Sequence, residues 1–302
     1  MTHPIARAVT ALAAFGGACF GWGLIEAHLY TVRRVEVEAL EPGSDPVRVL
    51  HISDLHLSAH QTRKLDFVRA LTRLKPDLVI NTGDNISSAA AIAPLLEAMS
   101  PLRGVPGVFV FGSNDYHAPV FKSPLRYLIH GRSHSGRPKP ADLPWESLRD
   151  GFAALGWVDL TERRATLNVA GTRIAFRGTD DAHHGRDDYS QVAGPADPDA
   201  GLNVGVTHAP YLKLLDAMTG DGMDLIFAGH THGGQVCVPG YGALITNCDI
   251  DPARVKGLST HDSGGRRSHL HVSGGLGTSP FAPYRFANRP EVTLLTLWPR
   301  PA

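Results

Sequence analysis

Cysteine is scarce in this chain. Only three cysteines, Cys19, Cys237 and Cys248, occur among its 302 residues. They are too few for a disulfide framework and lack the C-x-x-C spacing of zinc or redox motifs, so we expect structural thiols. Cys237 and Cys248 flank a Pro-Gly-Tyr-Gly turn. A disulfide across that hairpin is an alternative to free thiols in an oxidising compartment.

Net charge is also absent. The chain has 29 Lys and Arg against 29 Asp and Glu, so no overall field attracts nucleic acid, which we do not expect as a partner, although a local basic surface remains possible. A content of 43% hydrophobic and 19% charged residues excludes a disordered chain. The length allows one large domain or two small ones.

One uncharged stretch is long enough to be a candidate membrane-spanning segment. Residues 8–25 carry no charged side chain and lie between Arg7 and the pair Arg33 and Arg34. Eighteen apolar or uncharged residues can just span a bilayer. A cleaved signal peptide and a helix packed on the domain are the alternatives, and four glycines weaken the span. Because no A-x-A cleavage site follows, we predict a membrane anchor or signal-anchor at residues 1–32.

The side of the membrane is not decided by charge. Arg7 and the amino terminus on one flank balance Arg33 and Arg34 on the other, so the positive-inside rule does not discriminate. We place the folded domain, residues 33–302, on the extracytoplasmic side of the cell membrane only as a working hypothesis.

Hydrophobic periodicity predicts an α/β fold. Apolar runs indicate strands at 47–52, 77–81 and 107–111, and apolar residues at helical spacing indicate helices at 62–74 and 89–100, which gives βαβαβ and a parallel sheet. Closely spaced strands then follow at 166–169, 172–177, 203–206, 224–228, 243–246, 269–272 and 291–298. Two packed sheets follow from this order.

A long irregular segment separates the two halves. Residues 118–145 are rich in Pro and Gly and carry the basic side chains Lys122, Arg126, Arg132, Arg137 and Lys139. Such a stretch inside a domain is a solvated loop or a functional one. We predict an insertion that either lies in solvent or forms a basic cap near an anionic substrate.

Polar residues with metal-binding chemistry follow three successive strands of the first half. Asp54 and His56 come after the first strand, Asp84 after the second and Asn114 after the third. One D-x-H motif is weak, since Asp115-x-His117 and Asp181-x-His183 occur as well. Open parallel sheets, however, bind ligands at the carboxyl ends of their strands, so we expect these four residues to meet at one edge.

The second half repeats this arrangement. His208 ends one predicted strand, and His230 and His232 follow the apolar strand predicted at 224–228. A lone histidine is more often structural, and we expect that of His269 and His271, which lie within a strand. Two histidines directly after a buried strand and before Gly233-Gly234 favour ligands instead.

Seven such donors exceed the needs of one tetrahedral ion. They suit two adjacent divalent ions that share a carboxylate, and oxygen and imidazole donors without thiolate favour Mn, Zn or Fe. Two ions about 3.5 to 4 Å apart lower the pKa of a bridging water, and the resulting hydroxide can attack phosphorus. The sequence therefore predicts a dinuclear phosphoester hydrolase.

These residues resemble the calcineurin-like metallophosphoesterases. The blocks D-x-H, G-D, a lone His and G-H-x-H occur in order between residues 47 and 298. The resemblance implies a four-layer α/β/β/α sandwich. It also implies one metal held by Asp54, His56, His232 and Asp84 and a second held by Asp84, Asn114, His208 and His230. The uncharged amino-terminal segment and the ending around Arg285 and Arg289 look like the bacterial membrane-associated YkuE-like and YaeI-like branch.

One block departs from that family pattern. Where the family has Asn followed by His, this chain has Asn114-Asp115, so Asp115 with a raised pKa or His117 is the predicted catalytic acid. Arg285 and Arg289 are predicted to contact the substrate phosphate or to pair with surface acids. Asp180, Asp181, His183 and His184 either line the site or form a polar turn.

The predicted substrate is a phosphomonoester or phosphodiester, and anchoring points to a lipid-linked or cell-envelope one. A catalytically weak metal-binding or scaffold protein is one alternative, because the usual histidine is missing. A nuclease on the same fold is the other, and the neutral charge disfavours it.

Overall fold

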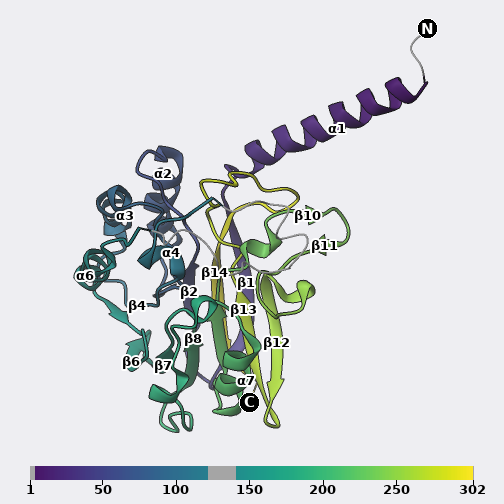
Figure 1. The fold of residues 1–302 in the computed structure, drawn as a ribbon. Coiled ribbons are helices and arrows are strands. Elements are labelled where there is room, and N and C mark those ends of the chain that lie inside the picture. The colour runs from purple at the N-terminus through teal and green to yellow at the C-terminus, as the bar shows by residue number, and fades with distance from the viewer. Residues whose placement is uncertain (1–3, 122–140, 302) are drawn as a thin grey trace.

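The computed structural model describes residues 4–121 and 141–301. Two six-stranded sheets form the centre of the molecule (Figure 1). The first has the order β1 (Thr31–Leu40), β14 (Glu291–Pro299), β2 (Val47–Ile52), β3 (Leu78–Asn81), β4 (Gly107–Phe109) and β5 (Trp157–Asp159). The second has the order β12 (Gly257–Ser263), β13 (Arg266–Val272), β9 (Leu225–Ala228), β8 (Leu202–Val206), β7 (Thr172–Gly178) and β6 (Arg163–Val169).

Within each sheet the central strands run parallel. β2 to β5 pair in parallel in the first sheet, where β14 is antiparallel to β2. In the second, β13, β9, β8 and β7 pair in parallel and the edge strands β6 and β12 are antiparallel. The carboxyl ends of parallel strands therefore gather at one edge of each sheet.

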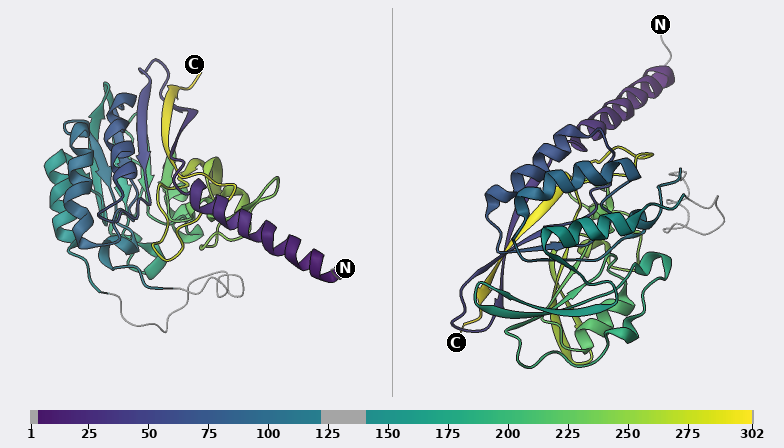
Figure 2. Two further views of the ribbon diagram at one scale, coloured as in Figure 1. Left: turned by 90° about the horizontal axis from the view of Figure 1, so that it is seen from above. Right: turned by 90° about the vertical axis from the view of Figure 1, so that its left-hand side faces the viewer.

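Three apolar layers hold the elements together. Side chains alternate along β2, where Val47 and Val49 point toward the second sheet and Leu50 and Ile52 point toward helices. The helices on the outer face of the first sheet are α2 (Thr62–Ala70), α3 (Ile92–Met99) and α6 (Trp145–Leu155). On the second sheet, α7 (Leu212–Gly220) covers β9 and β13 through Leu215 and Met218. The predicted α/β/β/α sandwich is confirmed, as the views in Figure 2 show.

Short elements fill the connections. They are α4 (Ser113–Tyr116), the hairpin strands β10 (Cys237–Val238) and β11 (Gly242–Ala243), and the 3-10 turns η1 (Leu71–Leu74), η2 (Ala89–Ala91), η3 (Ser100–Leu102), η4 (Ala182–His184), η5 (Tyr189–Gln191), η6 (His232–Gly234) and η7 (Pro252–Arg254). The thiols of Cys237 and Cys248 are free, so no disulfide crosses the hairpin.

The structure differs from the sequence prediction at several elements. β1, β5, β10, β12, α6 and α7 were not predicted, and β11 occupies Gly242–Ala243 rather than 243–246. The predicted domain boundary after residue 32 falls inside β1, which pairs with β14. The basic residues predicted for the insertion, Lys122, Arg126, Arg132, Arg137 and Lys139, lie outside the described residues.

The amino-terminal helix α1 (Pro4–Glu26) projects from the sandwich (Figure 1). Residues 6–26 are long and apolar enough to cross a membrane by length and composition, a test that a signal sequence also passes. The last turns of α1 contact the domain. The carbonyl of Gly23 accepts the N–H of Arg285, and the carboxylate of Glu26 accepts the N–H groups of Ala287 and Asn288.

Candidate metal centre

The seven predicted ligands follow the carboxyl ends of five parallel strands. Asp54 and His56 follow β2, Asp84 follows β3, and Asn114 lies in α4 beyond β4; His208 follows β8, and His230 and His232 follow β9. These strands are buried in the core, so their ends fix where each ligand-bearing loop begins. The structure brings the two groups of loops together between the sheets.

The backbone at this edge is unusually contorted. Asp54, His56, Asp84, His230 and His232 all have positive φ, between 42° and 69°. Non-glycine residues rarely adopt this left-handed conformation, and they are found together where a site demands it. Five of the seven predicted ligands share it, which favours a functional reason for these turns.

Glycines allow the loops to approach one another closely. A Cβ at Gly112 would lie 2.3 Å from Oδ1 of Asp84, and one at Gly229 would lie 1.9 Å from Oγ of Ser53. Contacts this short exclude any side chain at either position. These two glycines therefore let the loops of both sheets close around the carboxylates of Asp54 and Asp84.

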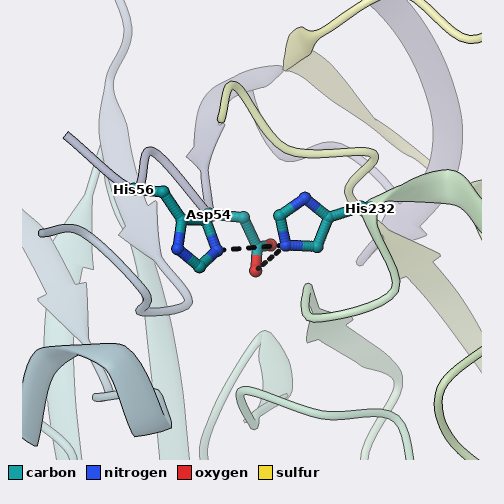
Figure 3. Close-up of side chains that lie close together, drawn as sticks. All are labelled: Asp54, His56 and His232. Atoms are coloured by element: carbon teal, nitrogen blue, oxygen red, sulfur yellow. Dashed lines mark hydrogen bonds and ion pairs between the residues drawn. The ribbon is translucent and has the colours of Figure 1, made fainter. Parts of the chain in front are cut away.

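Asp54, His56 and His232 form the first group of donors (Figure 3). Nε2 of His56 lies 3.0 Å from Nε2 of His232, and the latter nitrogen lies 3.6 Å from Oδ1 of Asp54. The other carboxylate oxygen of Asp54 accepts the N–H of His230 and the hydroxyl of Ser53. One oxygen is thus held by the protein and the other faces the two imidazoles.

The second group of donors is Asp54, Asp84 and His208, and Asp84 also lies beside the first group. Its Oδ2 is 3.3 Å from Nε2 of His56 and 3.6 Å from Nε2 of His208, and it also accepts the side-chain amide of Asn114 at 2.7 Å. His230 joins the second group, because its Nδ1 lies 3.3 Å from Nε2 of His208. One carboxylate therefore contacts residues of both groups.

The donor set fits cations better than it fits internal hydrogen bonding. Oδ1 of Asp54 is buried and has no hydrogen-bond partner among the described residues. An unsatisfied buried carboxylate oxygen is costly unless a cation neutralises it. Imidazole and carboxylate donors without thiolate are the chemistry of Mn, Fe or Zn. The residues present therefore fit divalent metal ions.

Burial and mutual charge shift the pKa values of these groups. Burial raises the pKa of Asp54 to about 6, helped by the nearby carboxylate of Asp84. Burial lowers the pKa values of His230 and His232 well below the usual range, so both imidazoles are neutral and can donate a lone pair. His208 differs, because the carboxylates of Asp84 and Asp54 outweigh burial and raise its pKa to about 9.

Asp115 is not placed as a catalytic acid would be. It is fully buried, and its carboxylate accepts the backbone N–H groups of Asp84, Asn85 and Gly112 at 2.7 to 3.0 Å. Burial raises its pKa to about 7. Both oxygens hold the Asp84 loop, an arrangement that favours a positioning role over proton donation to a substrate.

The predicted substrate residue Arg285 is also placed differently from expectation. Its side chain is 0% exposed, and its guanidinium donates to the carbonyls of Gly275, Gly277 and His232. The predicted pairing of Arg285 with surface acids is therefore wrong. Its guanidinium instead stabilises the loop of His232. Arg289 is exposed, and its contact with substrate stays a prediction.

Two further histidines lie near the ligand loops. The His183 ring centroid is 4.3 Å from that of His230, and its Nδ1 lies 2.9 Å from the hydroxyl of Tyr211. His117 follows α4 and its Nδ1 lies 2.9 Å from Oδ1 of Asp142. The turn at 180–184 therefore contacts the ligand loops through His183, and its role in the site stays a prediction.

Sequence reasoning missed Asn247. Its carbonyl oxygen and amide nitrogen lie 3.3 and 3.2 Å from Nε2 of His230, and its φ is 57°. Asn247 follows the short β10–β11 hairpin rather than a buried strand. The strand-end pattern that revealed the other residues therefore could not reveal this one.

Comparisons with known proteins agree with the geometry. The family model for calcineurin-like phosphoesterases matches residues 47–234. YkuE of Bacillus subtilis (strain 168), an uncharacterized metallophosphoesterase, is 27% identical over 309 residues, which cover 97% of this chain and 93% of YkuE. The phosphodiesterase YaeI of Escherichia coli (strain K12) is 26% identical over 258 residues, 83% of this chain and 82% of YaeI.

One further relative is named as a transmembrane protein. The transmembrane protein with metallophosphoesterase domain of Bos taurus is 25% identical over 227 residues, 72% of this chain and 47% of that protein. The family match covers well over half of the chain and includes all seven predicted ligands. The chain therefore belongs to the calcineurin-like phosphoesterase family, is similar to YkuE and YaeI within it, and is a hydrolase that acts on phosphoester bonds.

Proposed function

We propose that this chain hydrolyses phosphomonoesters or phosphodiesters with two divalent metal ions held by the seven residues of the metal centre. Asp54, His56 and His232 would hold one ion, and Asn114, His208 and His230 the other, with Asp84 shared. The observation that carries the proposal is the position of Asp84, whose Oδ2 lies 3.3 Å from His56 and 3.6 Å from His208.

The two ions would supply an acidified water and neutralise charge on the phosphoryl oxygens. The chain's own residues position everything else. The hydroxyl of Ser53 and the N–H of His230 orient the carboxylate of Asp54, and Asp115 holds the loop that carries Asp84. Arg285 fixes the backbone at His232 through its carbonyl. Such preorganisation limits the reorganisation that the reaction requires.

The proton donor in this proposal is an imidazole. Asp115 has both oxygens occupied by backbone N–H groups, whereas His117 has a partly exposed side chain and His183 lies against His230. A donor to the leaving group must reach the substrate. Turnover lost in His117→Gln or His183→Gln at unchanged metal content identifies the donor, and full turnover in both variants removes imidazole from this role.

The proposed substrate is lipid-linked or part of the cell envelope. The support is α1, which is long and apolar enough to anchor the chain in a membrane, on a side that its flanking charges do not fix. Alkaline extraction of membranes should leave the full chain in the pellet. Release into the supernatant would contradict anchoring.

Asp84→Ala tests the proposal most simply. Loss of the shared carboxylate should reduce metal-dependent hydrolysis of a bis-aryl phosphate by about a hundredfold or more. Asp66→Ala, which removes an exposed carboxylate from α2, is the matched control and should retain full activity. Full activity in Asp84→Ala would refute the mechanism.

A further inference from the structure

The β10–β11 hairpin and the adjoining loop carry an exposed hydrophobic patch. We define the hairpin patch as Val236, Val238, Tyr241, Leu244 and Phe281, whose exposed fractions range from 43% to 77%. Among the described residues, the other exposed large hydrophobic side chains lie on α1, apart from Phe121, which contacts Phe281, and from Leu258 and Trp298. Concentrated exposure of this kind marks an interaction surface.

The patch lies in a part of the chain without charge. Residues 233–248 contain no Asp, Glu, Lys or Arg, and neither do residues 270–284. Protein surfaces that meet water normally carry charged side chains at this length. An uncharged, partly aromatic surface suits the boundary between lipid head groups and acyl chains.

The hairpin patch is continuous with α1. The segment that bears Phe281 packs on the helix through Phe20 and Tyr284, whose ring centroids are 5.8 Å apart, and through the bond from Arg285 to Gly23. The same segment pairs with the hairpin, because Cys237 donates to Phe286 and Gln235 donates to Ala282. Figure 1 shows β10 and β11 on the side of the domain from which α1 leaves.

Little chain separates the helix from the domain. α1 ends at Glu26 and β1 begins at Thr31, and a turn at His28 and Leu29 shortens the connection further. Four residues span about 14 Å even when extended. With α1 in a membrane, a domain tied this closely to the helix would lie against the bilayer with the surface around Glu26.

The hairpin also adjoins the metal centre at both of its ends. It begins after His232, and Gly234 packs against Ala243. It returns at Asn247, which contacts Nε2 of His230. Whatever the hairpin patch contacts therefore lies beside two of the proposed metal ligands.

We infer that the hairpin patch docks into the lipid–water interface beside α1, so that the metal centre lies at the bilayer surface and acts on phosphoesters of lipids in that membrane. The statement about the substrate rests on the proposed function, whereas the docking surface rests only on the proposed anchoring of the chain by α1. A bilayer is the occupant because the patch continues the surface of α1 and contains no charge that would select a protein partner.

The docking is tested by quenching in lipid nanodiscs. The full chain with Tyr241→Trp, in discs whose lipids carry brominated acyl chains, should lose fluorescence beyond the loss shown by the unsubstituted chain. Asp262→Trp is the control, because this exposed residue precedes the turn between β12 and β13, at the opposite end of the strands from the metal centre. Equal quenching of the two probes would overturn the docking.

A second chain is the competing occupant. Discs that contain one chain each, isolated by size, should show the same quenching of Tyr241→Trp as the mixed preparation. Quenching confined to discs with two chains would assign the hairpin patch to a protein contact and overturn the inference.

Activity separates the docking from the proposed function. The double variant Val238→Ser with Tyr241→Ser should hydrolyse a disc-embedded hexadecyl nitrophenyl phosphate about fivefold or more slowly, because lost apolar burial weakens membrane contact. Its hydrolysis of water-soluble bis-nitrophenyl phosphate should stay within about twofold, as should both activities of Leu258→Ser. An equal fall on both substrates would overturn the role in substrate access. Quenching without hydrolysis of either substrate would instead refute the proposed function and leave the docking intact.

Discussion

At the scale of single residues, the buried carboxylate of Asp115 has the contacts expected of a positioning residue. Its carboxylate accepts three backbone N–H groups, two of them from the loop that carries Asp84. Hydrogen bonds to a charged acceptor contribute about 1.5 to 3 kcal/mol each to stability. The residue at this position therefore fixes the shape of the metal centre.

Asp115→Asn tests this role. The amide cannot accept all three N–H groups as a carboxylate does, so the free energy of unfolding should fall by about 2 to 4 kcal/mol and metal affinity should fall with it. Urea unfolding and metal titration measure the two effects. Asp251→Asn, at an exposed turn where the carboxylate accepts the N–H of Ala253, should change neither. Unchanged stability and metal affinity with lost turnover would restore Asp115 as the acid.

The sequence predicted the site residues only where chain geometry dictates position. Asp54, Asp84 and His208 could be found because polar residues directly after buried strands must meet at the carboxyl edge of a sheet. The burial of Arg285 could not, since it depends on the carbonyls of Gly275 and Gly277 in its own loop and of His232 in a loop distant in sequence. Neither could Asn247, which a hairpin rather than a strand delivers.

At the scale of elements, a histidine pair joins the two sheets. His51 of β2 and His271 of β13 lie with their Nδ1 atoms 2.8 Å apart, and both are buried. Burial lowers the pKa of His271 to about 3 and that of His51 well below its usual range. Unfolded histidines titrate near about 6.5, so below that pH the unfolded chain takes up protons that the folded chain refuses.

The folded state should therefore lose stability as the pH falls below about 6.5, and His271→Asn should weaken this dependence. The slope of the unfolding free energy against pH, between pH 6 and 4.5, should fall by up to about 1.4 kcal/mol per pH unit. Urea titrations in the presence of EDTA measure the slope without a contribution from metal release. His60→Asn, which changes an exposed histidine, should keep the slope of the unsubstituted chain, and the same slope in His271→Asn would contradict the assignment.

The end of α1 is joined to the metal centre by hydrogen bonds. Glu26 accepts the N–H groups of Ala287 and Asn288, and the Asn288 side chain donates to the carbonyls of His232 and Gly233. Asn288 is almost fully buried. Movement of the helix end would therefore reach the loop of a proposed ligand.

Glu26→Ala leaves two N–H groups without their acceptor, at about 1 to 3 kcal/mol for each buried one. Amide exchange at residues 284–288 should accelerate by about tenfold or more in the full chain in micelles. Hydrogen–deuterium exchange with peptide resolution measures it. Glu36→Ala, on the exposed face of β1, serves as the control, and equal exchange in both variants would show that the contact is not structural.

Strands could be predicted from the sequence where the side chains on one or both faces of the strand are buried. β2 matches its predicted bounds and β3 nearly so, because the Val, Leu and Ile side chains of both strands are buried. β1 was missed because charged residues, Arg33, Arg34 and Glu36 among them, interrupt its apolar positions at the sheet edge. Only its pairing with β14, 260 residues away in sequence terms, makes it a strand.

At the scale of the whole molecule, the sandwich explains why the seven proposed ligands, which come from distant segments, can share one site. Two sheets pack face to face through Val49, Ile80, Val204 and Phe227, among others, and their carboxyl strand ends meet at the same edge. Each sheet alone supplies an incomplete set of donors. The metal centre is therefore a property of the packed domain, with Asp84 from the first sheet beside His208 from the second.

Metal stoichiometry tests this account most directly. Calorimetric titration of the chelator-stripped full chain with Mn²⁺ should give two ions per chain, since the donors divide into two groups around Asp84. His56→Ala and His208→Ala, one change in each group, should each reduce the number of tightly bound ions to one. A single tightly bound ion in the unsubstituted chain, or two in both variants, would contradict the dinuclear centre.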